Sequence, residues 1–194
     1  MQVHGSEKPG SIGVPAPGVQ LRLVEDGKDV AVGCTGEVWV KSDSMTVGYW
    51  GDAAASLELY EQGWMKTGDL ACQDEDGYIW FVGRRKLIII RRGSNIAPAA
   101  VERVLATHPA VHASVVVGVP DATDGEVPVA WIVLKEKRPC AEALASHVAL
   151  QLASYEVPTQ FLFRPSLPLN SVGKFDRARL KEEARMQLHA CAGA

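Results

Sequence analysis

The chain has 194 residues, enough for one domain or two small ones, and its 47% hydrophobic and 22% charged residues are typical of a soluble globular protein. Its formal net charge of -3 argues against binding to nucleic acid or to an anionic membrane surface. The strongly apolar stretch at residues 87–90 is far too short to span a bilayer. Residues 1–9 are polar and carry no apolar signal-peptide core.

The cysteines suggest neither a disulfide framework nor a metal centre. Cys34, Cys72, Cys140 and Cys191 are widely scattered, and neither a CxxC pair nor a histidine cluster accompanies them. Disulfide frameworks and structural metal sites show recurrent cysteine spacings. We therefore expect no metal site in this chain, and a reducing cytoplasm as its location.

Residues 10–82 predict a β-rich subdomain. Residues 19–24 and 37–41 alternate between apolar and polar side chains, as half-buried strands do. Turns that contain glycine separate these stretches from one another and from a further apolar strand at 78–82. Because no long helical pattern interrupts the series, a small, distorted β-barrel or sheet is the expected fold of this part.

The pattern changes to mixed helices and strands after residue 86. The expected elements are a strand at 87–90, an irregular loop at 91–98, a helix beginning near Pro98, strands at 111–119 and 127–134, a helix at 141–153, a strand at 161–163 and a helix at 176–187. The helices carry apolar residues three and four positions apart, such as Leu144, Val148 and Leu152. This order predicts a compact α+β domain, with a short β-sheet flanked by helices.

The boundary between the two parts is a basic tripeptide, Arg84-Arg85-Lys86, and contains no flexible linker. We expect residues 1–85 to form the β-rich subdomain and residues 86–194 the α+β domain. A junction this short is typical of a hinge, in which a few backbone dihedrals absorb a large rotation.

Three short segments carry residues suited to nucleotide chemistry. They read GWMKTGDL at 63–70, DGYIWFVGRRK at 76–86 and PLNSVGK at 168–174. In the last of them, a glycine directly before Lys174 lets the backbone turn sharply and leaves the ammonium free to project. In this order and spacing the segments resemble the late motifs of the AMP-forming acyl-CoA synthetases, which belong to the adenylate-forming, AMP-binding enzymes. The resemblance extends from about Gly10 to about Leu180.

The resemblance implies that Asp69 and Arg84 bind the nucleotide. Asp69 lies in the Thr-Gly-Asp segment, where a carboxylate can accept hydrogen bonds from the two vicinal hydroxyls of a ribose. Arg84 follows a glycine at the end of an apolar strand, and its guanidinium can donate to ribose or phosphate oxygens. Taken without the resemblance, both positions are equally typical of surface turns.

The resemblance also implies a hinge and a coenzyme A loop. Lys86 falls at the family's hinge position, although the following Leu87 replaces a residue that is acidic or polar in many relatives. The segment RRGSNI at 91–96 resembles a Gly-Gly-x-Asn-Ile loop that lines the tunnel for the pantetheine arm of coenzyme A. Gly93 would allow close approach of that arm, with Ser94 beside it. Arg92 replaces the first glycine, and would either crowd the loop or offer a cation to a coenzyme A phosphate.

Lys174 is implied to be the catalytic residue of adenylation. A carboxylate attacks the α-phosphate of ATP in that step, and a fixed ammonium can neutralise the two anions as they approach each other. The alternative is a solvated lysine that precedes a helix.

The phosphate loop and the Tyr-Gly-x-Thr-Glu segment of the family are absent from the sequence. The chain therefore resembles the last subdomain of the large N-terminal portion, followed by the complete mobile C-terminal domain. Its implied ligands are ATP or AMP and coenzyme A, with Mg²⁺ held by residues outside this chain. Its implied partners are the missing N-terminal part and a small carboxylic acid, and the chain alone should be inactive.

Two alternatives remain open. The chain could come from an adenylation domain linked to a carrier protein, or it could be a non-catalytic module that binds nucleotide or coenzyme A. The first would need a downstream carrier. The combined presence of Asp69, Arg84 and Lys174 argues against the second.

Overall fold

The computed structural model describes residues 8–135 and 139–192. The chain divides into two compact units, Met1–Lys86 and Leu87–Ala194. Each unit is described by itself. No helix of the described residues is both long enough and apolar enough to cross a membrane.

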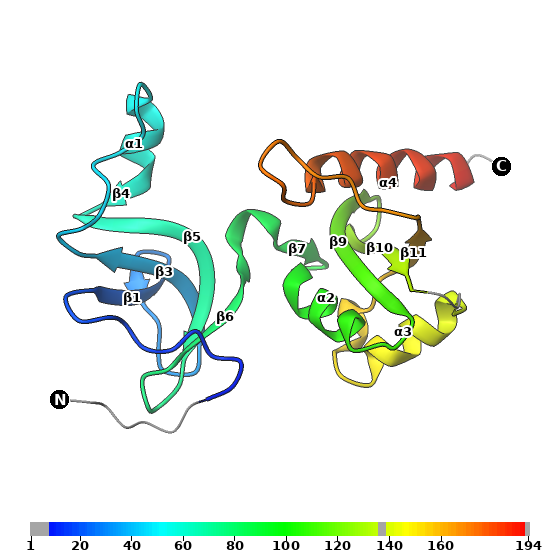
Figure 1. Ribbon diagram of the computed structural model, residues 1–194, viewed down its shortest axis with the longest axis horizontal. Coiled ribbons are helices and arrows are strands. Elements are labelled where there is room, and N and C mark those ends of the chain that lie inside the picture. Colours follow the sequence, from blue (N-terminus) through cyan, green and yellow to red (C-terminus); the bar gives the residue numbers. More distant parts are fainter. Residues whose placement is uncertain (1–7, 136–138, 193–194) are drawn as a thin grey trace. The chain divides into compact units, whose positions relative to one another are not determined.

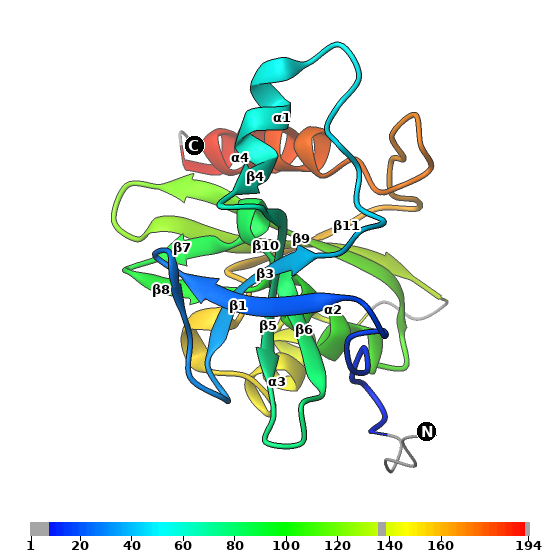
Figure 2. The same cartoon turned by 90° about the vertical axis from the view of Figure 1, so that its left-hand side faces the viewer.

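The first unit is a curled antiparallel sheet of six strands (Figures 1 and 2). Its strands are β1 (Gln20–Glu25), β2 (Lys28–Asp29), β3 (Thr35–Lys41), β4 (Tyr60–Glu61), β5 (Trp64–Gln73) and β6 (Ile79–Arg84). They pair in the order β2-β1-β3-β5-β4, and β6 also pairs with β5. Register shifts interrupt the ladder of β5 with β3 and that of β5 with β6. Such irregularities increase local twist, which explains the curl.

A small core holds this sheet together. Leu23, Val38, Ala71 and Ile79 are buried together on it. The short helix α1 (Ala53–Leu59) buries none of its residues. Asp52 caps its N-terminus, because the side chain of Asp52 accepts a hydrogen bond from the backbone amide of Ala55. The sequence did not predict α1 because a helix without a buried face leaves no apolar periodicity to detect.

The second unit has a five-stranded sheet covered by helices on both faces (Figure 1). Its strands are β7 (Ile89–Arg91), β8 (Ser94–Ile96), β9 (Val111–Asp121), β10 (Gly125–Leu134) and β11 (Gln160–Phe163). Its α-helices are α2 (Pro98–Ala106), α3 (Ala141–Ala149) and α4 (Arg177–Ala192). The strands pair in the order β11-β10-β7-β8, with β9 also on β10, and β11 runs parallel to β10.

Alternation along β9 and β10 produces two separate apolar layers. Val116 and Ile132 belong to a layer that includes residues of α2 and α3. Val115 and Trp131 belong to the opposite layer, which α4 closes with Leu180. The indole of Trp131 also donates a hydrogen bond of 3.0 Å to the carbonyl of Leu180, and this bond fixes α4 on the sheet.

The α+β class, with a distorted sheet before a helix-flanked sheet, is confirmed. Three details differ from the expectation. Residues 91–98 are not an irregular loop, because β7 and β8 pair as a hairpin. The helix expected at 141–153 ends at Ala149. The last helix begins at Arg177 and continues to Ala192.

Candidate nucleotide and coenzyme A sites

Asp69 and Arg84 lie opposite each other on β5 and β6. The Nε of Arg84 donates to Oδ1 of Asp69 at 2.7 Å, and the side chains of Arg84 and Asp69 are 59% and 31% exposed respectively. The pair is therefore accessible. Each group can exchange part of this contact for a ligand, because a carboxylate has several acceptor sites and a guanidinium several donors.

Within β5, a local turn at Thr67–Asp69 interrupts the pairing with β3 and carries Asp69. This local turn is fixed by hydrogen bonds. Gly68 has φ of +72°, a left-handed conformation that glycine adopts without strain. The hydroxyl of Thr67 donates to the carbonyl of Val38 at 2.8 Å and accepts from the amide of Asp69 at 3.1 Å. The amide of Gly68 donates to the carboxylate of Glu37 at 3.1 Å.

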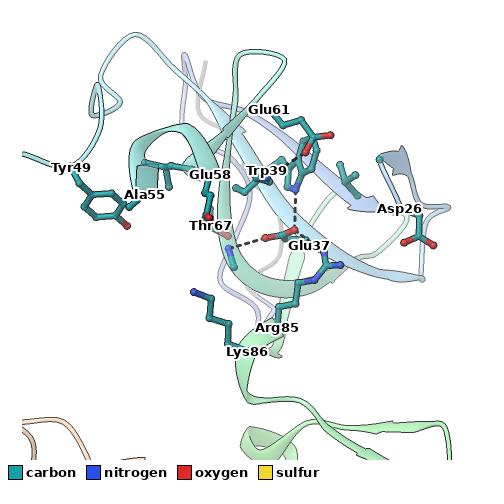
Figure 3. Close-up of a pocket in the computed structure, with 15 residues that line it drawn as sticks. Asp26, Glu37, Trp39, Tyr49, Ala55, Glu58, Glu61, Thr67, Arg85 and Lys86 are labelled. Atoms are coloured by element: carbon teal, nitrogen blue, oxygen red, sulfur yellow. Dashed lines mark hydrogen bonds and ion pairs between the residues drawn. The ribbon is translucent and has the colours of Figure 1, made fainter. Parts of the chain in front are cut away.

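A cavity of about 620 Å³ opens beside this turn (Figure 3). Thr67 and Gly68 line it, together with Glu37, Arg85 and Lys86. In Figure 3 the guanidinium of Arg85 reaches Glu37, whereas the side chain of Lys86 extends in another direction. The wall carries charges of both signs, which suits a ligand with several polar groups.

Arg85, Lys86 and Leu87 form a short 3₁₀ helix directly after β6. Lys86 is exposed. Its position as a hinge stays a prediction, but the element is short and has few contacts that would oppose a change of dihedrals.

The tip of the β7–β8 hairpin is held by one carboxylate. Asp124 accepts a hydrogen bond of 2.8 Å from Nε of Arg91 and one of 2.6 Å from Nε of Arg92. The backbone amide of Arg92 also donates to the carbonyl of Asp124, at 2.9 Å. The guanidinium of Arg91 and then that of Arg92 hold the pKa of the Asp124 carboxyl below its ordinary value of 3.8. Two cations share one anion, so the hairpin tip keeps a net positive charge.

Arg92 and Gly93 both have positive φ, of 48° and 80°. A non-glycine residue in this region is strained, and the contacts with Asp124 compensate for that strain at Arg92. Beside the tip lies a pocket of about 270 Å³, lined by Arg91, Arg92, Ser94, Ser154 and Tyr155. The structure thus brings Arg92 and Ser94 to one concave surface, with Gly93 between them in the chain.

Lys174 lies on an exposed turn before α4. The side chain of Asn170 accepts hydrogen bonds from the amides of Val172 and Lys174, at 3.1 and 2.9 Å. Gly173 has φ of +77°, as the sharp turn requires. Among residues 8–135 and 139–192, no hydrogen bond or ion pair of the Lys174 ammonium is found. The backbone is therefore fixed while the ammonium is free to meet a ligand.

Comparisons with known proteins identify the relatives of this chain. The family described as AMP-binding enzyme matches residues 1–50, and the one described as AMP-binding enzyme C-terminal domain matches residues 100–174. A long-chain-fatty-acid–CoA ligase of Yersinia pestis is 39% identical over 90% of this chain and 31% of its own length.

The solved structure of o-succinylbenzoate CoA synthetase from Bacillus subtilis, in complex with its acyl-adenylate intermediate, superposes with a TM-score of 0.86 at 36% identity. It covers 90% of this chain, and the chain covers 36% of it. An amide bond synthetase from Marinactinospora thermotolerans gives a TM-score of 0.84 at 35% identity, with 90% and 36% coverage.

Both units of the chain thus match models of the AMP-binding enzyme family. The chain spans about a third of the length of the relatives it matches. The family resemblance read from the three motifs is therefore confirmed, while the roles of the individual residues remain predictions.

Two residues with several contacts in the first and second units are not indicated by the sequence. Glu37 is 6% exposed and contacts the turn before Asp69. Asp124 is 7% exposed and holds the hairpin tip. A glutamate two positions before a tryptophan on an alternating strand was the available signal for Glu37, since both side chains share one face. Nothing near Asp124 indicates its pairing with arginines more than thirty positions away.

Proposed function

We propose that the chain is the C-terminal part of an AMP-forming acyl-CoA synthetase. The longer protein would convert a carboxylic acid, ATP and coenzyme A to acyl-CoA, AMP and pyrophosphate, by way of an acyl-adenylate. The observation that carries the proposal is the adjacent placement of Asp69 and Arg84 across β5 and β6, in a chain whose other unit presents Lys174 on a fixed turn. The name of the Yersinia pestis relative supports coenzyme A as the acceptor.

In the first half-reaction, Asp69 accepts hydrogen bonds from the ribose hydroxyls of ATP and Arg84 donates to the nucleotide. The carboxylate of the acid attacks the α-phosphate, and pyrophosphate leaves. Lys174 stabilises the negative charge that accumulates between the carboxylate and the phosphate, without a proton transfer. Mg²⁺ and the remaining phosphate contacts come from the part of the longer protein that precedes this chain.

In the second half-reaction, a rotation about Lys86 replaces Lys174 with the hairpin tip. The segment formed by Arg92, Gly93 and Ser94 then lines the path of the pantetheine arm. The thiol sulfur attacks the acyl carbonyl carbon, loses its proton and expels AMP. Such alternation lets one small domain serve two chemical steps in turn. A cytoplasmic location suits a chain whose cysteines follow no disulfide spacing.

The experiment that tests the proposal separates the two half-reactions in the longer protein. Pyrophosphate release with ATP and a panel of acids reports adenylation, and thioester formation from supplied acyl-adenylate reports the second step. The 194-residue chain alone should release no pyrophosphate, because the phosphate loop is absent from it. Robust turnover by the purified chain would contradict the assignment of this chain as a fragment.

An amine is the second candidate acceptor, on the strength of the similarity to an amide bond synthetase. Arg92 places a larger side chain where the resembling coenzyme A loop has a glycine. A competition assay with coenzyme A and simple amines distinguishes the two acceptors, since one product is a thioester and the other an amide.

A further inference from the structure

Glu37 is a buried carboxylate that receives three hydrogen bonds from three different parts of the first unit. Its Oε1 accepts from the amide of Gly68 at 3.1 Å. Its Oε2 accepts from the indole of Trp39 at 3.2 Å and from Nη1 of Arg85 at 2.9 Å. Burying a charge is costly unless partners of this kind compensate for it. The buried carboxylate of Glu37 therefore does more than fill space in the packing of β3.

Oε1 of Glu37 contacts the segment that carries Asp69, the residue expected to bind ribose. Gly68 directly precedes Asp69, and its left-handed backbone sets the direction in which β5 presents the Asp69 side chain. The hydrogen bond from Gly68 to Glu37 fixes this turn from the buried side, while Thr67 fixes it through the amide of Asp69.

Oε2 of Glu37 contacts Arg85, which lies at the junction after β6. Arg85 lies between Arg84, which pairs with Asp69, and Lys86, the proposed hinge. The side chain of Arg85 is 54% exposed, whereas that of Glu37 is 8% exposed. Arg85 can therefore be hydrated when it leaves, and Glu37 then keeps Trp39 and Gly68 as partners. The bond from Gly68 and the bond from Arg85, which Figure 3 shows reaching Glu37, can for this reason be lost independently of each other.

We propose that Glu37 is a positioning residue with two functions: it fixes the Thr67–Asp69 turn for ribose binding, and through Arg85 it forms a releasable restraint on the backbone next to Lys86. This proposal rests on the function proposed above, because it assigns Asp69 to the nucleotide and Lys86 to the rotation. The intact ion pair keeps the junction in the conformation described here, and its opening frees the dihedrals that must change.

The first test uses the 194-residue chain and needs no catalysis. Amide hydrogen exchange is measured for the unaltered chain and for Glu37→Gln, Arg85→Met and Arg22→Met. The last is a matched control, because Arg22 forms an ion pair of 2.6 Å with Asp29 on the same sheet.

Glu37→Gln should accelerate exchange at Gly68 by about tenfold or more, since a charge-assisted bond is replaced by a weaker neutral one. Arg85→Met and Arg22→Met should leave Gly68 protected. Unchanged exchange at Gly68 in Glu37→Gln would overturn the first function, whatever reaction the longer protein catalyses.

The second test uses the longer protein. Glu37→Gln should raise the KM for ATP in adenylation by about tenfold, with a smaller change in kcat, because the ribose ligand is less well placed. Arg85→Met should alter the rate of thioester formation from supplied acyl-adenylate and spare the KM for ATP. Arg85→Lys, which keeps a cation, should restore the normal thioester rate, and Arg22→Met should change neither step.

A thioester rate that is the same in Arg85→Met and Arg22→Met would remove the restraint from the mechanism. A purely structural role would lower stability in Glu37→Gln without a selective change in the KM for ATP. If the unaltered protein forms no acyl-adenylate with any acid, the proposed function fails. The exchange result at Gly68 still decides whether Glu37 fixes the turn.

Discussion

At the scale of single residues, the catalytic assignment depends on a cation held on a fixed backbone. Asn170 and Gly173 define the turn before α4, and the ammonium of Lys174 extends from an exposed position. A charge that is already oriented costs no reorganisation when the transition state forms. The turn therefore positions Lys174 through a fixed backbone, as Thr67 and Glu37 position Asp69.

Lys174→Ala in the longer protein should strongly reduce adenylation and spare thioester formation from supplied acyl-adenylate. Loss of one transition-state cation typically costs about 3–4 kcal/mol, a factor of roughly 10² to 10³ in rate. Lys28→Ala, which removes an exposed lysine from β2, is the control. Equal losses in both half-reactions would show that Lys174 is not specific to the first.

At the scale of elements, the β7–β8 hairpin depends on Asp124. Both arginines of the tip donate to this carboxylate, and they lower its pKa from the ordinary value of 3.8. A carboxyl whose pKa is lower in the folded state stabilises the fold above its unfolded pKa. That contribution disappears as the pH falls through the folded value.

Asp124→Asn should therefore destabilise the chain near neutral pH, and the deficit should shrink as the pH falls below 3.8. The measurement is the free energy of unfolding at several pH values for the unaltered chain, Asp124→Asn and the exposed control Asp43→Asn. A deficit that stays constant well below that pH would mean that the ion pairs with Arg91 and Arg92 contribute nothing.

The elements also show how far the sequence determines this fold. The alternation on β1 and β3 and the apolar run of β9 are visible in the sequence, and β9 is buried on both faces. The sequence predicts a loop in place of the hairpin because β7 and β8 have only three residues each and are joined through two arginines. What stabilises that tip is a carboxylate on a distant loop.

The candidate site also contains residues that the sequence predicts and residues that it does not predict. Asp69, Arg84 and Lys174 lie in motifs whose residue order carries chemical meaning. Glu37 lies in an ordinary strand, and its role appears only when Gly68 and Arg85 are brought to it from 31 and 48 positions away. Partners that are distant in sequence leave no local pattern, so reasoning about periodicity and motifs does not detect them.

At the scale of the whole molecule, two compact units meet at a 3₁₀ turn that contains Lys86. The proposed mechanism requires this turn to adopt two conformations. Proline has φ near -65°, which a 3₁₀ turn accepts, but it blocks a change of that dihedral.

Lys86→Pro in the longer protein should retain one half-reaction and lose the other, and we expect adenylation to survive. Lys86→Ala should keep both, because alanine leaves the dihedral free. The two half-reactions are assayed separately, and circular dichroism confirms that the variants are folded. A folded Lys86→Pro protein with a normal thioester rate would place the rotation at another residue.

The most direct test of the central claim is the product balance of the longer protein. ATP, coenzyme A and a panel of carboxylic acids are supplied, and the nucleotide, phosphate and acyl products are quantified together. The account predicts AMP, pyrophosphate and acyl-CoA in equal amounts for at least one acid. ADP with inorganic phosphate, or AMP with an amide and no thioester, would contradict it.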